Sequence, residues 1–285
     1  MAVPFKVDLG GKTAAVTGGS GVLCSRMAVA LAECGARVAV ISRRQEAVDS
    51  VAEEIAAAGG EAIGVSCDVL DRQALAAARS RIEESYGPID ILINGAGGNH
   101  PGGTTSSEHL TFDQLQNVDT DVRSFFDLDD VGVQNVFNLN FIGTLLPTQI
   151  LARSMVEKGD GVIINVSSMS AMLPLTKVPA YSAAKAAVSN FTQWLAVHMS
   201  QVGIRVNAIA PGFFLTDQNR ALLTAEGGGL SARGDTIVSQ TPMGRFGQPG
   251  ELVGTLLWLV SDQAAGFVTG TVIAVDGGFA AFSGV

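Results

Sequence analysis

The chain has 285 residues, of which 47% are hydrophobic and 16% charged, and its formal net charge is −9. This length can bury a large core, and the acidic balance argues against a nucleic-acid surface. No apolar run is long enough for a membrane span or a secretory signal, and three cysteines without C-x-x-C spacing indicate reduced thiols, so we expect a cytoplasmic protein with no metal site.

Apolar strand-like runs alternate with helix-like segments along the whole chain. Near-continuous Val, Ile and Ala in each run predict strands buried on both faces, as in a parallel sheet. The strands are expected at 13–17, 37–42, 61–67, 90–95, 161–167, 205–211 and 271–277. The helices are expected around 22–34, 45–58, 71–86, 133–157, 181–202 and 249–261. This order predicts an α/β fold: a Rossmann-like, doubly wound parallel sheet of about seven strands with helices on both faces.

We expect a single domain over 1–285, because no linker or internal repeat divides the chain. Two irregular segments interrupt the alternation, an insertion at about 98–132 and a loop at about 212–247. The insertion holds seven Asp and Glu residues against Arg123 alone, a net of −6. We interpret it as a solvated acidic surface, because its acids lack the spacing and glycine of a calcium loop.

Polar residues and glycines follow six of the predicted strands. In open parallel sheets, ligands bind beyond the carboxyl ends of the strands, so these residues predict a ligand crevice along one rim. They are "TGGSG" 17–21, Ser42-Arg43-Arg44, Cys67-Asp68, Asn94-Gly95-Ala96-Gly97, Ser167-Ser168 and Pro211-Gly212.

The glycines after the first strand are typical of a pyrophosphate-binding turn. The string 19–24, GSGVLC, fits G-x-G-x-x-(small) with Cys24 in the last position. Glycine lets the backbone approach a phosphate, and the next helix offers free N–H groups. A plain strand–helix turn is the alternative.

The end of the second strand decides the type of dinucleotide. An acid there holds the ribose 2′-OH of NAD, but this chain has Ser42 followed by Arg43 and Arg44. Two guanidiniums without a carboxylate suit a 2′-phosphate, so NADP(H) is favoured and NAD(H) is the alternative. The two arginines could instead be surface charges that open a helix.

Tyr181 and Lys185 are four residues apart and share a helix face. A tyrosine is a poor acid or base at pH 7, and a nearby ammonium stabilises its phenolate. Ser168 stands thirteen residues upstream at a strand end, where its hydroxyl can bind a substrate oxygen. A Tyr-x-x-x-Lys spacing alone also occurs by chance in many helices, but together with Ser168 it favours proton transfer at a substrate oxygen.

This pattern resembles the short-chain dehydrogenase/reductase family. The resemblance runs from about residue 10 to 280, in the family's motif order. It rests on the glycine loop, "NGAG" 94–97, "NFIG" 140–143, Ser168, Tyr181-x-x-x-Lys185, "PGFFLT" 211–216 and "VDGG" 275–278.

The resemblance implies an NAD(P)-dependent oxidoreductase with four catalytic residues. Tyr181 would be the general acid/base, and Lys185 would lower its pKa and bind the nicotinamide ribose. Ser168 would orient the substrate carbonyl. Asn140 would hold a water linked to Lys185; Asn138 is the less favoured candidate for that role. Family members are commonly tetramers or dimers, so we expect a homotetramer or homodimer.

The same resemblance implies a set of cofactor contacts. They are Gly18, Ser20, Gly21, Val22, Leu23, Ser42, Arg43, Arg44, Cys67, Asp68, Val69, Asn94, Ala96, Gly97, Tyr181, Lys185, Pro211, Gly212, Phe214 and Thr216. The chain departs from the family's usual T-G-x-x-x-G-x-G, because Val22 and Cys24 occupy glycine positions. We therefore expect Gly21 to have a backbone conformation that favours glycine, and Cys24 to be a small packing residue.

Several longer segments resemble one subgroup, the short-chain-type D-mannonate oxidoreductases or fructuronate reductases. They include "INGAGGNHP" 93–101 and "APGFFLTDQNRALLT" 210–224, and the insertion belongs to that subgroup's pattern. A sugar acid needs hydroxyl, amide and cationic groups around the tyrosine. The candidate substrate residues are Asn99, His100, Ser170, Lys177 and Arg220. Lys177 or Arg220 could pair with the carboxylate, and we expect Arg220 to be the anchor. Other carbonyl substrates (gluconate-type or 3-oxoacyl) and a non-catalytic cofactor-binding protein are the alternatives.

Overall fold

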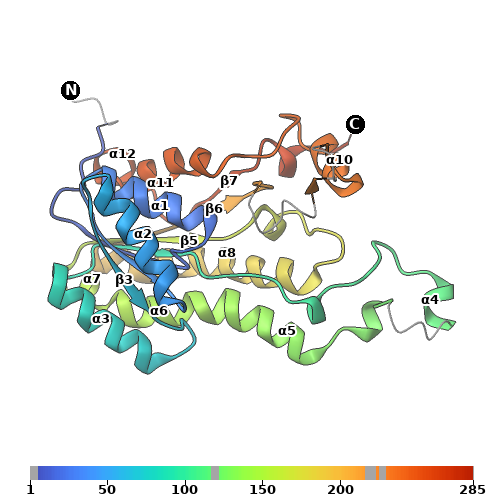
Figure 1. Cartoon of the computed structure of the whole chain (residues 1–285), viewed down its shortest axis with the longest axis horizontal. Helices are drawn as coiled ribbons and strands as arrows, with labels where there is room; N and C mark the ends of the chain where they lie inside the picture. The colour runs from blue at the N-terminus through green and yellow to red at the C-terminus, as the bar shows by residue number, and fades with distance from the viewer. Residues whose placement is uncertain (1–5, 117–121, 216–222, 225–228, 285) are drawn as a thin grey trace.

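The computed structural model describes residues 6–116, 122–215, 223–224 and 229–284 of the chain. Its centre is a seven-stranded sheet in the order β3-β2-β1-β4-β5-β6-β7, and every neighbouring pair is parallel (Figure 1). The strands are β1 (Thr13–Thr17), β2 (Arg37–Ser42), β3 (Glu61–Ser66), β4 (Ile91–Asn94), β5 (Gly161–Val166), β6 (Ile204–Pro211) and β7 (Val272–Val275). The predicted fold class is confirmed.

Helices cover both faces of this sheet. They are α1 (Val22–Glu33), α2 (Gln45–Ala57), α3 (Arg72–Tyr86), α4 (Phe112–Gln116), α5 (Asp130–Phe137), α6 (Gly143–Leu151), α7 (Arg153–Lys158), α8 (Pro179–Met199), α10 (Ala232–Ser239), α11 (Val253–Val260) and α12 (Asp262–Ala265). Among the described residues, no helix is long and apolar enough to cross a membrane.

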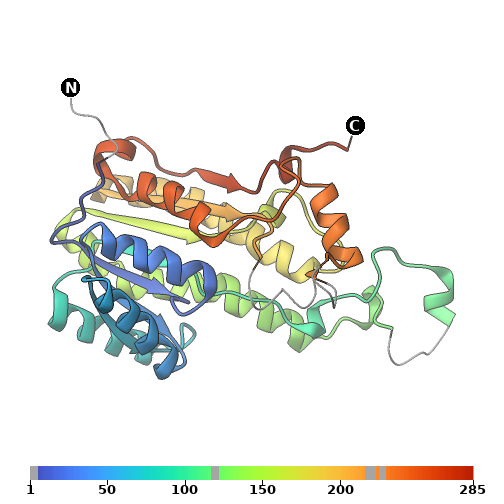
Figure 2. The same ribbon diagram turned by 45° about the horizontal axis from the view of Figure 1, so that its top comes forward.

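Successive side chains of each strand point to opposite faces of the sheet, which gives the interior two hydrophobic cores. Ala14 and Val16 of β1 pack with α1, α2 and α11 on one face of the sheet. Ala15, between them, packs with α3, α6 and α8 on the other face. Figure 2 shows α1 and α11 on the near side of the strands. Because both faces are covered, a ligand can approach the inner strands only at their ends, and the carboxyl ends open into the cavity described below.

The predicted helix at 133–157 is interrupted. A π-helical turn over Asn138–Ile142 separates α5 from α6, and Ala152 separates α6 from α7. A π turn adds a residue to the helical repeat and is found most often at functional sites. Apolar periodicity gave no sign of this interruption, and it also gave no sign of α10.

The acidic insertion forms an arm that projects from the body beside the amino end of α5 (Figure 1). The carbonyl of Pro101 accepts from Arg123, and the Ser106 N–H donates to the carbonyl of Arg123. These bonds join the two sides of the arm near its base. Contrary to a purely solvated acidic surface, the arm also exposes large apolar side chains. These are Leu110, Phe112, Leu115, Phe125 and Phe126.

Candidate active site

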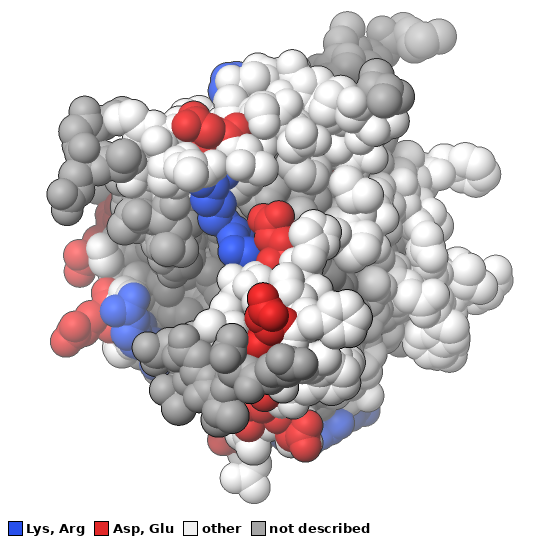
Figure 3. Space-filling model, turned by 90° about the vertical axis from the view of Figure 1, so that its right-hand side faces the viewer, with Lys and Arg blue, Asp and Glu red and all other residues white. Residues whose placement is uncertain are grey.

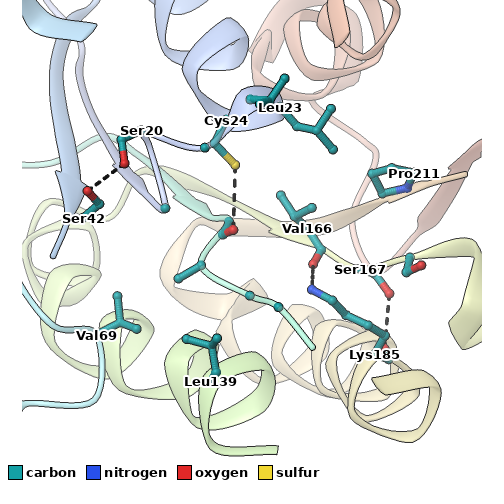
Figure 4. Close-up of a pocket in the computed structure, with 18 of the residues that line it drawn as sticks. Ser20, Leu23, Cys24, Ser42, Val69, Leu139, Val166, Ser167, Lys185 and Pro211 are labelled. Atoms are coloured by element: carbon teal, nitrogen blue, oxygen red, sulfur yellow. Dashed lines mark hydrogen bonds between the residues drawn. The ribbon is translucent and has the colours of Figure 1, made fainter. Parts of the chain in front are cut away.

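A cavity of about 730 Å³ opens along the carboxyl ends of β1 to β6. This volume is in the range of small-molecule and cofactor sites. Eighteen predicted cofactor residues and Ser168 line it: Gly18, Ser20, Gly21, Val22, Leu23, Ser42, Arg43, Arg44, Cys67, Asp68, Val69, Ala96, Gly97, Ser168, Tyr181, Lys185, Pro211, Gly212 and Phe214. Figure 4 shows several of them converging from α1, β2, β5 and α8. Residues far apart in the chain thus share one cavity.

Gly18 is the position in the loop whose backbone conformation requires glycine. Its φ is +64°, and a Cβ there would lie 2.7 Å from the carbonyl oxygen of Gly95. Gly21 instead has φ −77° and ψ 153°, an extended conformation open to any residue, at the N-cap of α1. The expectation that Gly21 has a glycine-favouring conformation is therefore wrong, because the sharp turn occurs three residues earlier.

Cys24 packs α1 directly onto the end of β4. Its side chain is 4% exposed, and its Sγ lies 3.9 Å from the carbonyl oxygen of Gly95. A Cβ on Gly95 would overlap that sulfur. Burial raises the pKa of the Cys24 thiol to about 11, so it is not a reactive thiolate at neutral pH. Cys24 therefore acts as a packing residue that fits because residue 95 is a glycine.

The end of β2 has the polarity expected for the adenosine side of a dinucleotide. The Ser20 hydroxyl donates to Ser42 Oγ at 2.8 Å, which joins the glycine loop to β2 (Figure 4). Arg43 and Arg44 are exposed and face the cavity. Among the described residues, neither guanidinium has an acidic partner within ion-pair distance. This edge can accept an additional negative charge.

Lys185 carries a deeply buried ammonium. The side chain is 4% exposed, and Nζ donates to the carbonyl oxygen of Val166 at 2.8 Å. Burial lowers the pKa of Lys185 to about 8. Ser167, between Val166 and Ser168, donates from Oγ to the carbonyl of Lys185 at 3.2 Å, so β5 and α8 are joined at two points (Figure 4).

Tyr181 lies one helical turn before Lys185, and Nζ is 5.7 Å from the centre of its ring. Burial raises the pKa of Tyr181, and a hydrogen bond with the Ser168 hydroxyl opposes this rise. Sequence reasoning expected Lys185 to lower the pKa of Tyr181. In this structure the burial of the phenol raises its pKa, and the group that opposes this rise is the Ser168 hydroxyl rather than Lys185.

Asn140 lies within the π turn and is fully buried. Its Nδ2 donates to the carbonyls of Gly98 at 2.7 Å and Val136 at 2.8 Å, and its Oδ1 accepts from the Gly98 N–H at 3.2 Å. A Cβ on Gly97 would lie 2.8 Å from Asn140 Oδ1 and 3.1 Å from Lys185 Nζ. Asn140 is thus beside Lys185, whereas Asn138 is exposed.

Asn94 does not line the cavity. Its Nδ2 donates inward to Thr148 Oγ1 at 2.8 Å and to Asn165 Oδ1 at 2.9 Å. The side chain therefore links β4 to α6 and β5 below the rim. Only the segment that follows it, from Gly95 to Gly98, reaches the cavity.

Four predicted substrate residues lie around the cavity without lining it. Asn99 Nδ2 donates to Thr104 Oγ1, and His100 Nδ1 accepts from the Gly102 N–H at 3.0 Å. Ser170 is buried behind Ser168. Lys177 has φ +70°, a left-handed conformation unusual for lysine, and its carbonyl accepts from the Thr105 N–H at 2.9 Å. Thr216 and Arg220 lie outside the described residues.

Sequence reasoning missed part of the cavity wall. The lining residues that were not predicted are Cys24, Gly98, Leu139, Val166 and Phe213, whereas Gly95 and Ser167 line the cavity as the predicted rim requires. Their neighbours in the chain were predicted, so proximity in sequence was the available signal for most of them. Leu139 is next to the predicted Asn140 and reaches the cavity from the π turn.

The described part of the chain contains no cluster of His, Cys, Asp and Glu suited to a metal ion. The end of the molecule seen in Figure 3 is mostly uncharged, with basic and acidic side chains scattered over it.

Comparison with known proteins identifies the class. Residues 12–227 match the family model for short chain dehydrogenase. The chain therefore belongs to the short-chain dehydrogenase/reductase family, and it is an oxidoreductase of the NAD(P)-binding type that this family comprises.

Individual relatives cover the whole chain. The protein named Uncharacterized oxidoreductase UxuB of Bacillus subtilis (strain 168) is 51% identical over 99% of this chain and 100% of its own length. A crystal structure with bound NAD, from a Haemophilus influenza protein proposed to be a D-mannonate oxidoreductase, is 49% identical with a TM-score of 0.93, and each chain is covered completely. Gluconate 5-dehydrogenase of Gluconobacter oxydans (strain 621H) is 34% identical over 98% of each chain.

The contact between Cys24 and Gly95 predicts a coupled pair of substitutions. Gly95→Ala should destabilise the fold by about 1–3 kcal/mol, because the new Cβ overlaps Cys24 Sγ and lies 2.9 Å from the carbonyl oxygen of Thr17. Adding Cys24→Ala removes the first overlap and should restore part of the loss. Urea denaturation of the single and double variants measures the coupling. Gly254→Ala is the control, because a Cβ there meets nothing within 4 Å. Additive changes in stability for Gly95→Ala and Cys24→Ala would contradict the contact between the two residues.

The buried ammonium predicts that Lys185→Met stabilises the fold. Since the folded pKa of Lys185 is about 8 against an ordinary 10.5, the charged side chain costs about 3 kcal/mol below pH 8. Between pH 8 and 10.5 the folded state loses this proton before the unfolded state does, so the cost disappears.

Denaturant titrations at pH 7 and pH 10 test this sign. The free energy of unfolding of the variant should exceed that of the wild type at pH 7, and the difference should be smaller at pH 10. Lys12→Met is the control, because it removes an ion pair to Asp160 at 2.9 Å and should not stabilise the fold. A Lys185→Met protein less stable than the wild type at pH 7 would show that burial of the ammonium does not destabilise the fold.

Proposed function

We propose that this protein transfers hydride between a nicotinamide dinucleotide and a secondary alcohol or ketone of a sugar acid, with D-mannonate and D-fructuronate as the pair. The observation that carries the proposal is that Ser168, Tyr181 and Lys185 line the same cavity as the glycine loop. A protein that only bound a cofactor would have no need of a tyrosine–lysine–serine set at the end of that cavity.

The chain's own residues fit a dinucleotide. Gly18 and Gly95 keep side chains out of the turn, and α1 begins at Val22 with its unpaired N–H groups toward the cavity. When bound, the nicotinamide supplies or accepts a hydride at C4. Tyr181 gives or takes the proton at the substrate oxygen, and Ser168 donates a hydrogen bond to that oxygen. Lys185 holds positive charge beside the phenol, and Asn140 fixes the Gly97–Gly98 backbone.

A polyhydroxylated acid is supported by the residues around the tyrosine. Asn99 is exposed and His100 is half-buried. Because His100 Nδ1 accepts the Gly102 N–H, its Nε2 is left to donate to a substrate hydroxyl. Lys177, and Arg220 outside the described residues, are the candidate carboxylate anchors. A gluconate-type substrate is the second candidate, supported by the gluconate 5-dehydrogenase relative.

For the cofactor we propose NADP(H), with NAD(H) as the second candidate. Arg43 and Arg44 face the cavity beside the Ser20–Ser42 hydroxyl pair, which supports contact with a 2′-phosphate. The second candidate is supported by the NAD found in the 49% identical structure.

We also propose a cytoplasmic homodimer or homotetramer. The nearly all-apolar α11 and the edge strand β7, both partly exposed, support an interface between copies. Light scattering measures the mass in solution, and a monomer would contradict this part of the proposal.

The reaction is tested at 340 nm with purified protein, both cofactors, and mannonate, fructuronate, gluconate and simple ketones. Activity should be highest with the mannonate–fructuronate pair. Tyr181→Phe should lower kcat by at least about 10²-fold, because it removes the proton donor, with little change in nucleotide Kd. A protein that binds dinucleotide and turns over none of these substrates would contradict the proposal.

The cofactor proposal predicts a selective effect at Arg43. Arg43→Ala should raise the KM for NADPH about tenfold or more, because a charge-assisted hydrogen bond to phosphate is lost. The KM for NADH should change little. Arg72→Ala, on α3 away from the cavity, is the matched control. An equal rise in the KM for both cofactors in Arg43→Ala, or a wild-type preference for NADH, would contradict the proposal.

A further inference from the structure

Ser170 is a buried serine that forms two hydrogen bonds with the hydroxyl oxygen of Ser168. It belongs to the short 3-10 turn Met169–Ala171 that follows β5 and Ser168. Its side chain is 1% exposed and does not line the 730 Å³ cavity, whereas Ser168 does. The geometry therefore does not place Ser170 in direct contact with a substrate in this cavity.

Two donors of Ser170 converge on one atom. The Ser170 N–H donates to Ser168 Oγ at 3.2 Å, and the Ser170 hydroxyl donates to the same oxygen at 3.0 Å. A serine hydroxyl has two acceptor lone pairs and one proton. With both lone pairs engaged, the Ser168 hydroxyl can act toward the cavity only as a donor.

We propose that Ser170 is a positioning residue that orients the Ser168 hydroxyl as a hydrogen-bond donor to the reacting oxygen. This inference rests on the proposed function for its catalytic consequence. The donor direction agrees with the effect of the Ser168 hydroxyl on Tyr181 in the absence of substrate, where its hydrogen bond lowers the pKa of the phenol against the effect of burial. Donation into Ser168 also polarises its O–H bond, which strengthens the outgoing hydrogen bond.

Ser170→Ala should keep the backbone N–H bond and the 3-10 turn but free one lone pair of Ser168. The hydroxyl can then rotate and accept instead of donate. With one net hydrogen bond lost, kcat should fall roughly threefold to tenfold. The limb of the pH–rate profile that belongs to Tyr181 should move to higher pH. Ser170→Thr retains the hydroxyl and should recover most of kcat, and Ser170→Cys serves if threonine does not fit.

A second readout does not depend on turnover. The chain has only two tyrosines, so Tyr86→Phe leaves Tyr181 as the single phenol. In that background, ¹³C NMR of the labelled ring carbon should show that Ser170→Ala raises the pKa of Tyr181. Ser189→Ala is the matched control, because Ser189 hydrogen-bonds Ser167 at 2.7 Å without contacting Ser168, and it should leave that pKa unchanged.

A double-mutant cycle separates the outcomes. If Ser170 acts through Ser168, Ser170→Ala should have no further effect in a Ser168→Ala background. An undiminished effect there, or an unchanged pKa of Tyr181 in Ser170→Ala, would overturn the inference. If the wild type reduces no substrate, the proposed function fails, yet the NMR titration still decides whether Ser170 orients Ser168.

Discussion

The structure of the site depends on one constraint, which is that an ammonium group must be held inside the protein beside a tyrosine. Lys185 Nζ donates to a backbone acceptor, the carbonyl of Val166, at the end of β5. This contact requires β5 to end where α8 passes, and the Ser167 bond to the carbonyl of Lys185 fixes the same junction. Tyr181, one turn earlier on α8, is thereby placed opposite Ser168 at the end of β5.

The cofactor side of the cavity follows from packing at the other end of the same rim. Gly18 makes the sharp turn, and Gly95 leaves room for the sulfur of Cys24. The loop departs from its family's usual glycine spacing, but α1 still begins at Val22 with its N-terminus toward the cavity. A larger residue at position 24 is compatible with the loop because the neighbouring strand end contributes no side chain there.

Much of this could be predicted from local sequence. The seven strands lie where apolar runs end in glycine or polar residues, because burial on both faces of the sheet leaves a continuous pattern. The Tyr181–Lys185 spacing likewise follows from helix geometry alone. What could not be predicted depends on neighbours distant in the chain. The inward turn of Asn94 toward Thr148 and Asn165, the π turn at Asn140, and the place of Ser170 behind Ser168 are examples.

The Lys185 ammonium is buried beside Tyr181 at a cost in folding free energy. NMR titration of the labelled Lys185 side chain in the wild-type protein measures this burial directly, with Lys185→Met used to assign the signal. The structure predicts a pKa of about 8. A pKa near the ordinary value of 10.5 would show that the side chain is solvated, and it would contradict the account of how this site is organised.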